Sequence, residues 1–236
     1  KENDIIYIVD LSVSTNTKDK FIELCNNIYS KKATLHWIDH HTSSQELMSI
    51  DIQFKNLLNT LNVDYFINTN FCAMYNCWLH LLKSFPIPEI VRIIDDYDCW
   101  KLNLQGTKAF QLAFGIEDKI SEPNNITWYK LFNNSEYCLN YIKKMVDNGN
   151  SIISYLISTD LDYCKSYGYE TILCGLSCYA LNKRRNSDIF SHYIEDYDIV
   201  LSYIYNGDNY VYSVYSTKDE VDCSKVAELF GGGKAS

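Results

Sequence analysis

Two short apolar runs with a helical segment between them constrain the fold of this chain more than any other feature. Residues 5–9 and 34–38 are each long enough for one buried strand, and residues 17–29 carry apolar side chains at helical spacing. A helix between two strands is the usual crossover that joins parallel neighbours in a sheet. This order therefore predicts an α/β domain built on a parallel sheet.

The rest of the chain predicts a second, smaller unit. Residues 135–156 have the spacing of one long helix, which we expect to connect the two units. We divide the chain into an N-terminal parallel-sheet domain at 1–134, a connecting helix at 135–160 and a smaller C-terminal α/β domain at 161–236. Further helices are expected at 44–61, 69–83, 187–194 and 224–230, and the C-terminal strands at 171–174, 177–180, 199–205 and 210–215.

Three apolar runs end in acidic residues. They are "IIYIVD", which ends at Asp10, "LHWIDHH", which ends at Asp39-His40-His41, and "VRIIDDYDCW", which contains Asp95, Asp96 and Asp98. The carboxyl ends of parallel strands lie along one edge of a sheet, so we expect these side chains to meet there. Carboxylates suit Mg²⁺ and Mn²⁺, and an imidazole shifts the preference toward Mn²⁺, Fe²⁺ or Zn²⁺. The pattern predicts a metal site, and a site with two metal ions can clamp a phosphoryl group and activate water for attack on it.

Each run taken singly also has an ordinary structural interpretation. An aspartate after a strand is often a helix cap or a turn residue, and several acids in a row often form a solvated turn. A pair of adjacent histidines is more often structural than ligating. The combination of three such runs is what favours the metal site.

Composition argues against several classes of protein. The formal net charge of −9 disfavours a broad basic face for long duplex nucleic acid. No apolar run has membrane-spanning length, so we expect no membrane partner. The nine cysteines include no Cys-x-x-Cys pair, which favours reduced thiols in a cytoplasmic protein over a zinc ribbon or a disulfide framework.

These motifs, in this order, resemble the DHH phosphoesterase superfamily. The resemblance spans residues 10–236 and is carried by "VD" after the first strand, "IDHH", "DDYDCW" and "FGGG" after the last helix. The superfamily includes RecJ-like nucleases, nano-RNases and cyclic-dinucleotide phosphodiesterases, and this chain looks most like the nano-RNase B-like branch. The resemblance implies a catalytic domain followed by a DHH-associated substrate-binding domain. It also implies a Mn²⁺-dependent phosphodiesterase in which two metal ions activate water against short oligonucleotides.

The resemblance assigns metal ligands to this chain. It implies that Asp10, His40 and Asp96 ligate metal. It also implies that Asp98 contacts these ligands without binding the metal itself. Two Mn²⁺ ions are expected in the complete protein, with Mg²⁺ as the alternative ion.

Two further residues receive catalytic roles from the same resemblance. Asp39 would orient a neighbouring histidine and fix its tautomer. His41 would face the scissile phosphate as a hydrogen-bond donor or acid–base partner.

The C-terminal motif implies a region that binds a short oligonucleotide or a small nucleotide. Gly231, Gly232 and Gly233 would let backbone N–H groups approach a phosphate closely. Ser213 and Ser216 flank the position at which many relatives carry an arginine.

The chain departs from the superfamily pattern at both ends. An Asp-x-Asp-Gly segment and a histidine after the glycines are both missing, so we expect the chain to be the remainder of a longer protein. Three functions stay open on the sequence: hydrolysis of short oligonucleotides, hydrolysis of cyclic oligonucleotides or nucleoside 3′,5′-bisphosphates, and nucleotide binding by a degenerate site without catalysis. A homodimer is compatible with all three.

Overall fold

Two of the expected strands and a third, unexpected one form the sheet of the N-terminal unit. β1 (Ile5–Val9), β2 (Thr34–Asp39) and β3 (Val63–Ile67) run parallel, in the order β1-β2-β3. The computed structural model describes residues 3–117, 122 and 125–232, and the chain divides into units at residues 1–150 and 151–236. The protein is of the α/β class, as predicted, and the boundary between its units falls inside the expected connecting helix.

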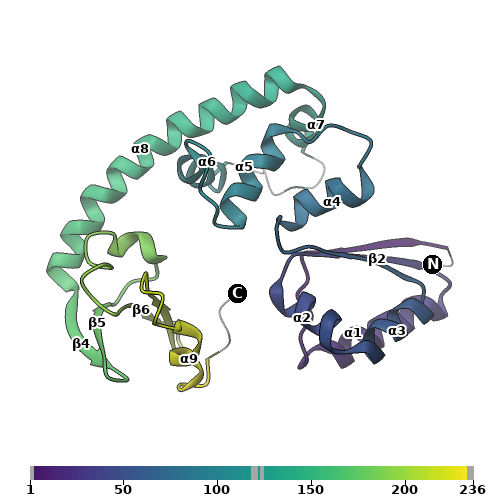
Figure 1. Cartoon of the computed structure of the whole chain (residues 1–236). Coiled ribbons are helices and arrows are strands. Elements are labelled where there is room, and N and C mark those ends of the chain that lie inside the picture. The colour runs from purple at the N-terminus through teal and green to yellow at the C-terminus, as the bar shows by residue number, and fades with distance from the viewer. Residues whose placement is uncertain (1–2, 118–121, 123–124, 233–236) are drawn as a thin grey trace. The chain divides into compact units, whose positions relative to one another are not determined.

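Three helices cover one face of this sheet and complete its core. Beside the strands in Figure 1 lie α1 (Lys18–Ser30), α2 (Thr42–Ile50) and α3 (Ile52–Thr60). The fully buried Trp37 of β2 packs against Phe21 of α1 and Phe54 of α3, with ring centroids 4.6 Å and 6.5 Å apart. Burial of one large apolar side chain contributes roughly 1.5–3 kcal/mol, so this aromatic cluster anchors β2 to its helices.

A helical layer follows the sheet, and it contains the main correction to the expected fold. The run that ends in "DDYD" is the helix α5 (Glu89–Asp98) and supplies no strand edge. Its residues Ile90 and Ile93 are buried at helical spacing, and Pro88 precedes the first turn, where a missing N–H does no harm. The other helices of this layer are α4 (Ala73–Leu81), α6 (Thr107–Phe114), α7 (Ile126–Asn133) and the first part of α8 (Ser135–Tyr167).

Helix α8 continues to Tyr167, past its predicted end at residue 156. It spans the boundary between the two units, so each part of it belongs to a different unit. Neither α8 nor any other helix in the described ranges combines the length and the apolar character that crossing a bilayer requires.

The C-terminal unit is built on a four-stranded sheet of order β4-β5-β6-β7. Its elements are β4 (Tyr169–Leu173), β5 (Leu176–Leu181), the short helix η1 (Ser187–Phe190), β6 (Ile199–Tyr205), β7 (Tyr210–Tyr215) and α9 (Cys223–Glu228). β5 and β6 pair in parallel, and the two outer pairs are antiparallel. All four predicted strands form, and the predicted bounds of β6 and β7 are confirmed. The two central strands are buried on both faces, which explains their nearly continuous apolar sequences.

Helix α8 meets α6 at a point where only glycine fits. A Cβ atom built on the buried Gly149 would lie 1.8 Å from the backbone oxygen of Ala109. The obstacle is main chain, which cannot rotate away as a flexible side chain can. The two helices therefore depend on the absence of a side chain at residue 149 for their close approach.

We predict that Gly149→Ala destabilises the N-terminal unit by about 3 kcal/mol or more, because the added methyl forces two helices apart. Asn148→Ala changes an exposed neighbour on the same helix and should alter stability by no more than about 0.5 kcal/mol. Urea unfolding followed by circular dichroism measures both variants. Equal stability of the two variants would contradict this close packing of α6 and α8.

Candidate metal centre

The chain turns sharply at Asp10, directly after β1. Asp10 has a φ of +63°, in the left-handed region that aspartate tolerates better than most residues. Its N–H still donates to the carbonyl of Ile38 at 3.0 Å, so the turn begins at the last rung between β1 and β2. The N–H of Val13 donates to the buried Ser44 Oγ of α2 at 2.8 Å. These bonds hold the loop after β1 against β2 and α2, and so fix the backbone that carries the Asp10 carboxylate.

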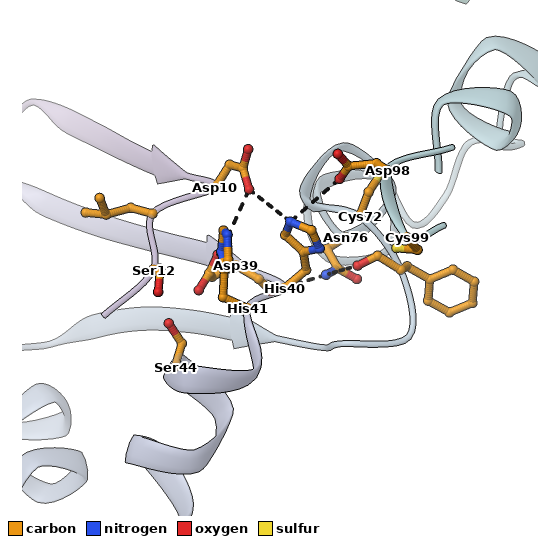
Figure 2. A network of polar contacts seen from close by, with 12 residues as sticks. Asp10, Ser12, Asp39, His40, His41, Ser44, Cys72, Asn76, Asp98 and Cys99 are labelled. Carbon is orange, nitrogen blue, oxygen red and sulfur yellow. Dashed lines mark hydrogen bonds and ion pairs between the residues drawn. The ribbon is translucent and has the colours of Figure 1, made fainter. Parts of the chain in front are cut away.

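Four side chains converge at this edge of the sheet (Figure 2). His40 Nε2 lies 3.1 Å from Asp10 Oδ1 and 3.6 Å from Asp98 Oδ2. His41 Nδ1 lies 4.0 Å from the same Asp10 oxygen. The potential ligand atoms of Asp10, His40 and His41 all lie within 4.8 Å of one another. The structure thus brings together the residues that follow β1 and β2, as the sequence pattern predicts.

Asp39 is fully buried beside His41. Its Oδ1 lies 2.8 Å from His41 Nδ1, so we assign the proton of the neutral imidazole to Nδ1 and leave Nε2 as an acceptor. The other oxygen, Oδ2, is buried and has no hydrogen-bond partner within the described ranges. A buried carboxylate oxygen without a donor is costly, so Asp39 favours a positive charge near this site.

Asn76 of α4 fixes the end of β2 and was not anticipated from the sequence. Its buried amide Nδ2 donates to the backbone oxygens of Asp39, Asn68 and Phe71, at 3.2, 2.7 and 3.1 Å. These contacts tie α4 to the strand end from which His40 and His41 emerge. The one amide of the mainly apolar helix α4 was the available signal.

Asp98, and not Asp96, is the acid of α5 that contacts His40. Both oxygens of the buried Asp96 accept hydrogen bonds from the segment that follows α5, namely from Asn103 N–H at 2.9 Å, Leu104 N–H at 3.0 Å and Thr107 Oγ1 at 2.5 Å. Burial raises the pKa of Asp96, but these bonds outweigh it and leave the pKa below its ordinary value. The expected roles are reversed: Asp96 fastens a loop, and Asp98 faces the histidine.

The acids around His40 fit a divalent cation. Burial raises the pKa of Asp98 above its ordinary value; His40 opposes the rise, whereas Asp10 and Asp95 add to it. Asp95 itself is paired with Lys101 at 2.6 Å, which leaves Asp10 and Asp98 on either side of one imidazole nitrogen. Two carboxylates and an imidazole form a donor set that suits Mn²⁺, and a cation between them would relieve their repulsion.

The residues expected to bind substrate separate into two groups in the C-terminal unit. Gly231 and Gly232 line a cavity of about 680 Å³ together with Tyr210, Tyr212 and Phe230. Gly233 lies outside the described residues.

Ser213 and Ser216, which were expected to bind substrate, do not line this cavity. Ser213 alternates with the cavity-lining Tyr212 and Val214 along β7, so it points to the opposite face of the sheet. Ser216 Oγ donates to the Asp198 carbonyl at 2.7 Å and accepts the N–H of Lys218 at 3.0 Å, which is a structural role.

We predict opposite effects for two neighbouring acids of α5. Asp96→Ala should cost about 3 kcal/mol of stability, because it leaves buried hydrogen-bond donors without an acceptor. Asp98→Ala should change stability by about 0.5 kcal/mol or less, because the side chain is half exposed, but it should weaken Mn²⁺ binding. Chemical unfolding and calorimetric titration with Mn²⁺ measure the two effects. A stable Asp96→Ala protein with impaired Mn²⁺ binding would restore Asp96 as the ligand.

Comparison with known proteins adds little to this geometry. No protein-family model matches the chain, and no curated protein does. A structural similarity exists to the crystal structure of an uncharacterized protein from Helicobacter pylori G27, with 14% sequence identity and a TM-score of 0.38, over 97% of this chain and 74% of that one. A similarity of this strength carries no argument about function.

Proposed function

We propose that the protein is a Mn²⁺-dependent phosphodiesterase that hydrolyses short oligonucleotides or similarly small nucleotides. The observation that carries the proposal is the convergence of Asp10 and Asp98 on His40 Nε2, at 3.1 and 3.6 Å, beside the His41–Asp39 pair. Acids that meet around an imidazole at the carboxyl ends of parallel strands lie where α/β proteins bind their ligands.

Asp10, His40 and Asp98 would hold the metal. When bound, a divalent ion of this kind lowers the pKa of its water and polarises the phosphoryl oxygens. Asp10 contributes from the turn after β1, where its backbone N–H is bonded to the carbonyl of Ile38. His40 contributes from the residue after β2, where Asn76 restrains the preceding carbonyl.

His41 and Asp39 would act in the proton transfer of the hydrolysis. Asp39 accepts from His41 Nδ1 at 2.8 Å, which orients the ring and leaves Nε2 for the substrate. In its protonated form His41 donates from Nε2 to a phosphate oxygen or to the departing oxygen, and the buried Asp39 carboxylate stabilises the imidazolium. This division gives the two adjacent histidines different functions.

The cavity of the C-terminal unit supports a nucleotide as the substrate. Tyr210 and Tyr212 present exposed rings to it, and nucleobases stack on such rings with about 1–3 kcal/mol each. Gly231 and Gly232 line it without side chains, and their N–H groups donate to the carbonyls of Glu228 and Ala227 at 3.1 and 2.9 Å. The net charge of −9 disfavours long polyanions, which limits the proposal to short chains or single nucleotides.

We expect the purified protein with Mn²⁺ to hydrolyse 5′-labelled di- to pentanucleotides. His41→Asn should lower kcat by roughly 10²–10⁴-fold, the usual contribution of one acid–base group, and leave the Mn²⁺ affinity unchanged. His40→Asn should abolish both hydrolysis and Mn²⁺ binding. Product analysis by chromatography and calorimetry with Mn²⁺ are the measurements.

His192→Asn is the matched control for these substitutions, because His192 is exposed and lies in the C-terminal unit. Cyclic dinucleotides, nucleoside 3′,5′-bisphosphates and bis(p-nitrophenyl) phosphate, assayed in parallel, separate the choice of substrate from the chemistry. Nucleotide binding with no hydrolysis of any of these compounds would identify a binding protein and overturn the proposed activity.

The nucleotide cavity makes a separate prediction. Tyr212→Ala should raise KM by about 5- to 150-fold and leave kcat unchanged, because stacking contributes equally before and during the reaction. Tyr155→Ala removes an exposed tyrosine of α8 that does not line the cavity, and it should have neither effect. Steady-state kinetics on a dinucleotide measures both variants. An unchanged KM for Tyr212→Ala would place the base elsewhere.

A further inference from the structure

A second group of ligand-type side chains lies on the face of the N-terminal sheet opposite Trp37. His36 of β2 and Asp64 of β3 are direct partners in the parallel register, and His80 comes from α4. His36 Nδ1 and His80 Nε2 lie 2.7 and 2.8 Å from the same oxygen, Asp64 Oδ2. Three separate elements thus direct two imidazoles and one carboxylate at a single point.

Aromatic neighbours fix the orientation of both imidazole rings. Tyr7 of β1 stacks on His36 with ring centroids 4.8 Å apart and an interplanar angle of 15°. Phe66 of β3 stacks on His80 at 5.1 Å, also with an angle of 15°. Two rings held in this way lose little freedom on binding a ligand, so the group is already organised.

The group is partly open to solvent and holds a charge. Burial raises the pKa of Asp64, but hydrogen bonds from His80 and His36 outweigh it and place the pKa below its ordinary value. The Asp64 side chain is 43% exposed, against 19% and 23% for His36 and His80. An ion can therefore enter from solvent, and the carboxylate can shift to accommodate it.

We propose that His36, Asp64 and His80 bind one divalent transition-metal ion, of which Zn²⁺ is the best match. Two imidazole nitrogens and one carboxylate oxygen are the protein ligands of many zinc sites, in which water fills the fourth position. Bonds of about 2.0–2.1 Å to a tetrahedral ion separate ligand atoms by roughly 3.3 Å. The nitrogen-to-oxygen distances of 2.7 and 2.8 Å need to widen only slightly.

This site is distinct from the Asp10–His40 centre. Side chains alternate along β2, so His36 projects from the face opposite Asp39 and Trp37. The donor sets also differ, since two carboxylates surround His40 whereas two imidazoles surround Asp64. The zinc site stands on its own observations and does not require the proposed hydrolytic activity.

The test uses the full chain with the other centre removed by Asp10→Asn and His40→Asn, and with the exposed Cys174 changed to Ser to avoid binding by a surface thiol. Calorimetric titration should give one Zn²⁺ per chain, and Zn²⁺ should raise the Tm. Co²⁺ used as a probe should give the visible absorption of a tetrahedral site with nitrogen and oxygen ligands.

Two additions to this background separate a metal site from a set of hydrogen bonds. Asp64→Asn keeps an acceptor for the imidazole N–H groups, so the protein should fold but lose the Zn²⁺ stoichiometry and the rise in Tm. His192→Gln removes a histidine outside the group and should preserve both. Zn²⁺ binding that survives Asp64→Asn, or no binding in the background protein, would overturn the proposal and leave a hydrogen-bonded link between β2, β3 and α4.

Discussion

Strand β2 is hydrogen-bonded on both sides, to β1 and to β3, and hydrophobic packing favours its register. The buried Trp37 and Leu35 face the helices, and a slip of one residue would move them to the opposite face of the sheet. The same register sets Val9 beside Ile38, so that Asp10 and Asp39 leave the sheet at one level. Hydrophobic packing of β2 against the helices thus sets the register that brings the residues after β1 and β2 to one edge of the sheet.

A buried polar group at the end of β2 lowers the stability of the fold unless it has hydrogen-bond partners. Asp39 is fully buried, and its Oδ2 has no donor among the described residues, while His41 satisfies the other oxygen. Natural folds rarely retain such a group without a function, because a well-packed apolar residue would be as stable or more so. The Asp96 carboxylate illustrates the opposite case, since every bond it accepts serves the local fold.

The sequence identified strands where apolar runs are bounded by turn residues, as at residues 5–9, 199–205 and 210–215. It did not identify β3, because Asp64 interrupts a run of only five residues and looks like a loop. It misjudged "VRIID" because a short apolar run has the same composition in a buried helix and in a buried strand. These errors arise because the pattern of apolar residues in a short segment contains no information about which residues pack against that segment in the fold.

The candidate site, like the fold, was predictable only in part. The residues directly after β1 and β2 were found, because parallel strands define an edge by topology alone. The choice between Asp96 and Asp98 depended on which way each side chain leaves α5 and on a loop that returns to meet one of them. Ser213 does not line the cavity of the C-terminal unit, because the cavity lies on the face of β7 that carries Tyr212, and the spacing of residues does not reveal which face that is. The group around Asp64 was not predicted because β3, the strand that carries Asp64, was not predicted.

Helix α4 carries Asn76 and His80 one helical turn apart: Asn76 contacts the carbonyl of Asp39 at the end of β2, and His80 contacts Asp64 of β3, which pairs with His36 nearer the start of β2. A rigid helix cannot adjust one of these contacts without moving the other. If an ion occupies the group around Asp64, its binding energy and the order of the β2 terminus become linked quantities, and the linkage acts equally in both directions. The helix then makes the two ends of one short strand thermodynamically dependent on each other.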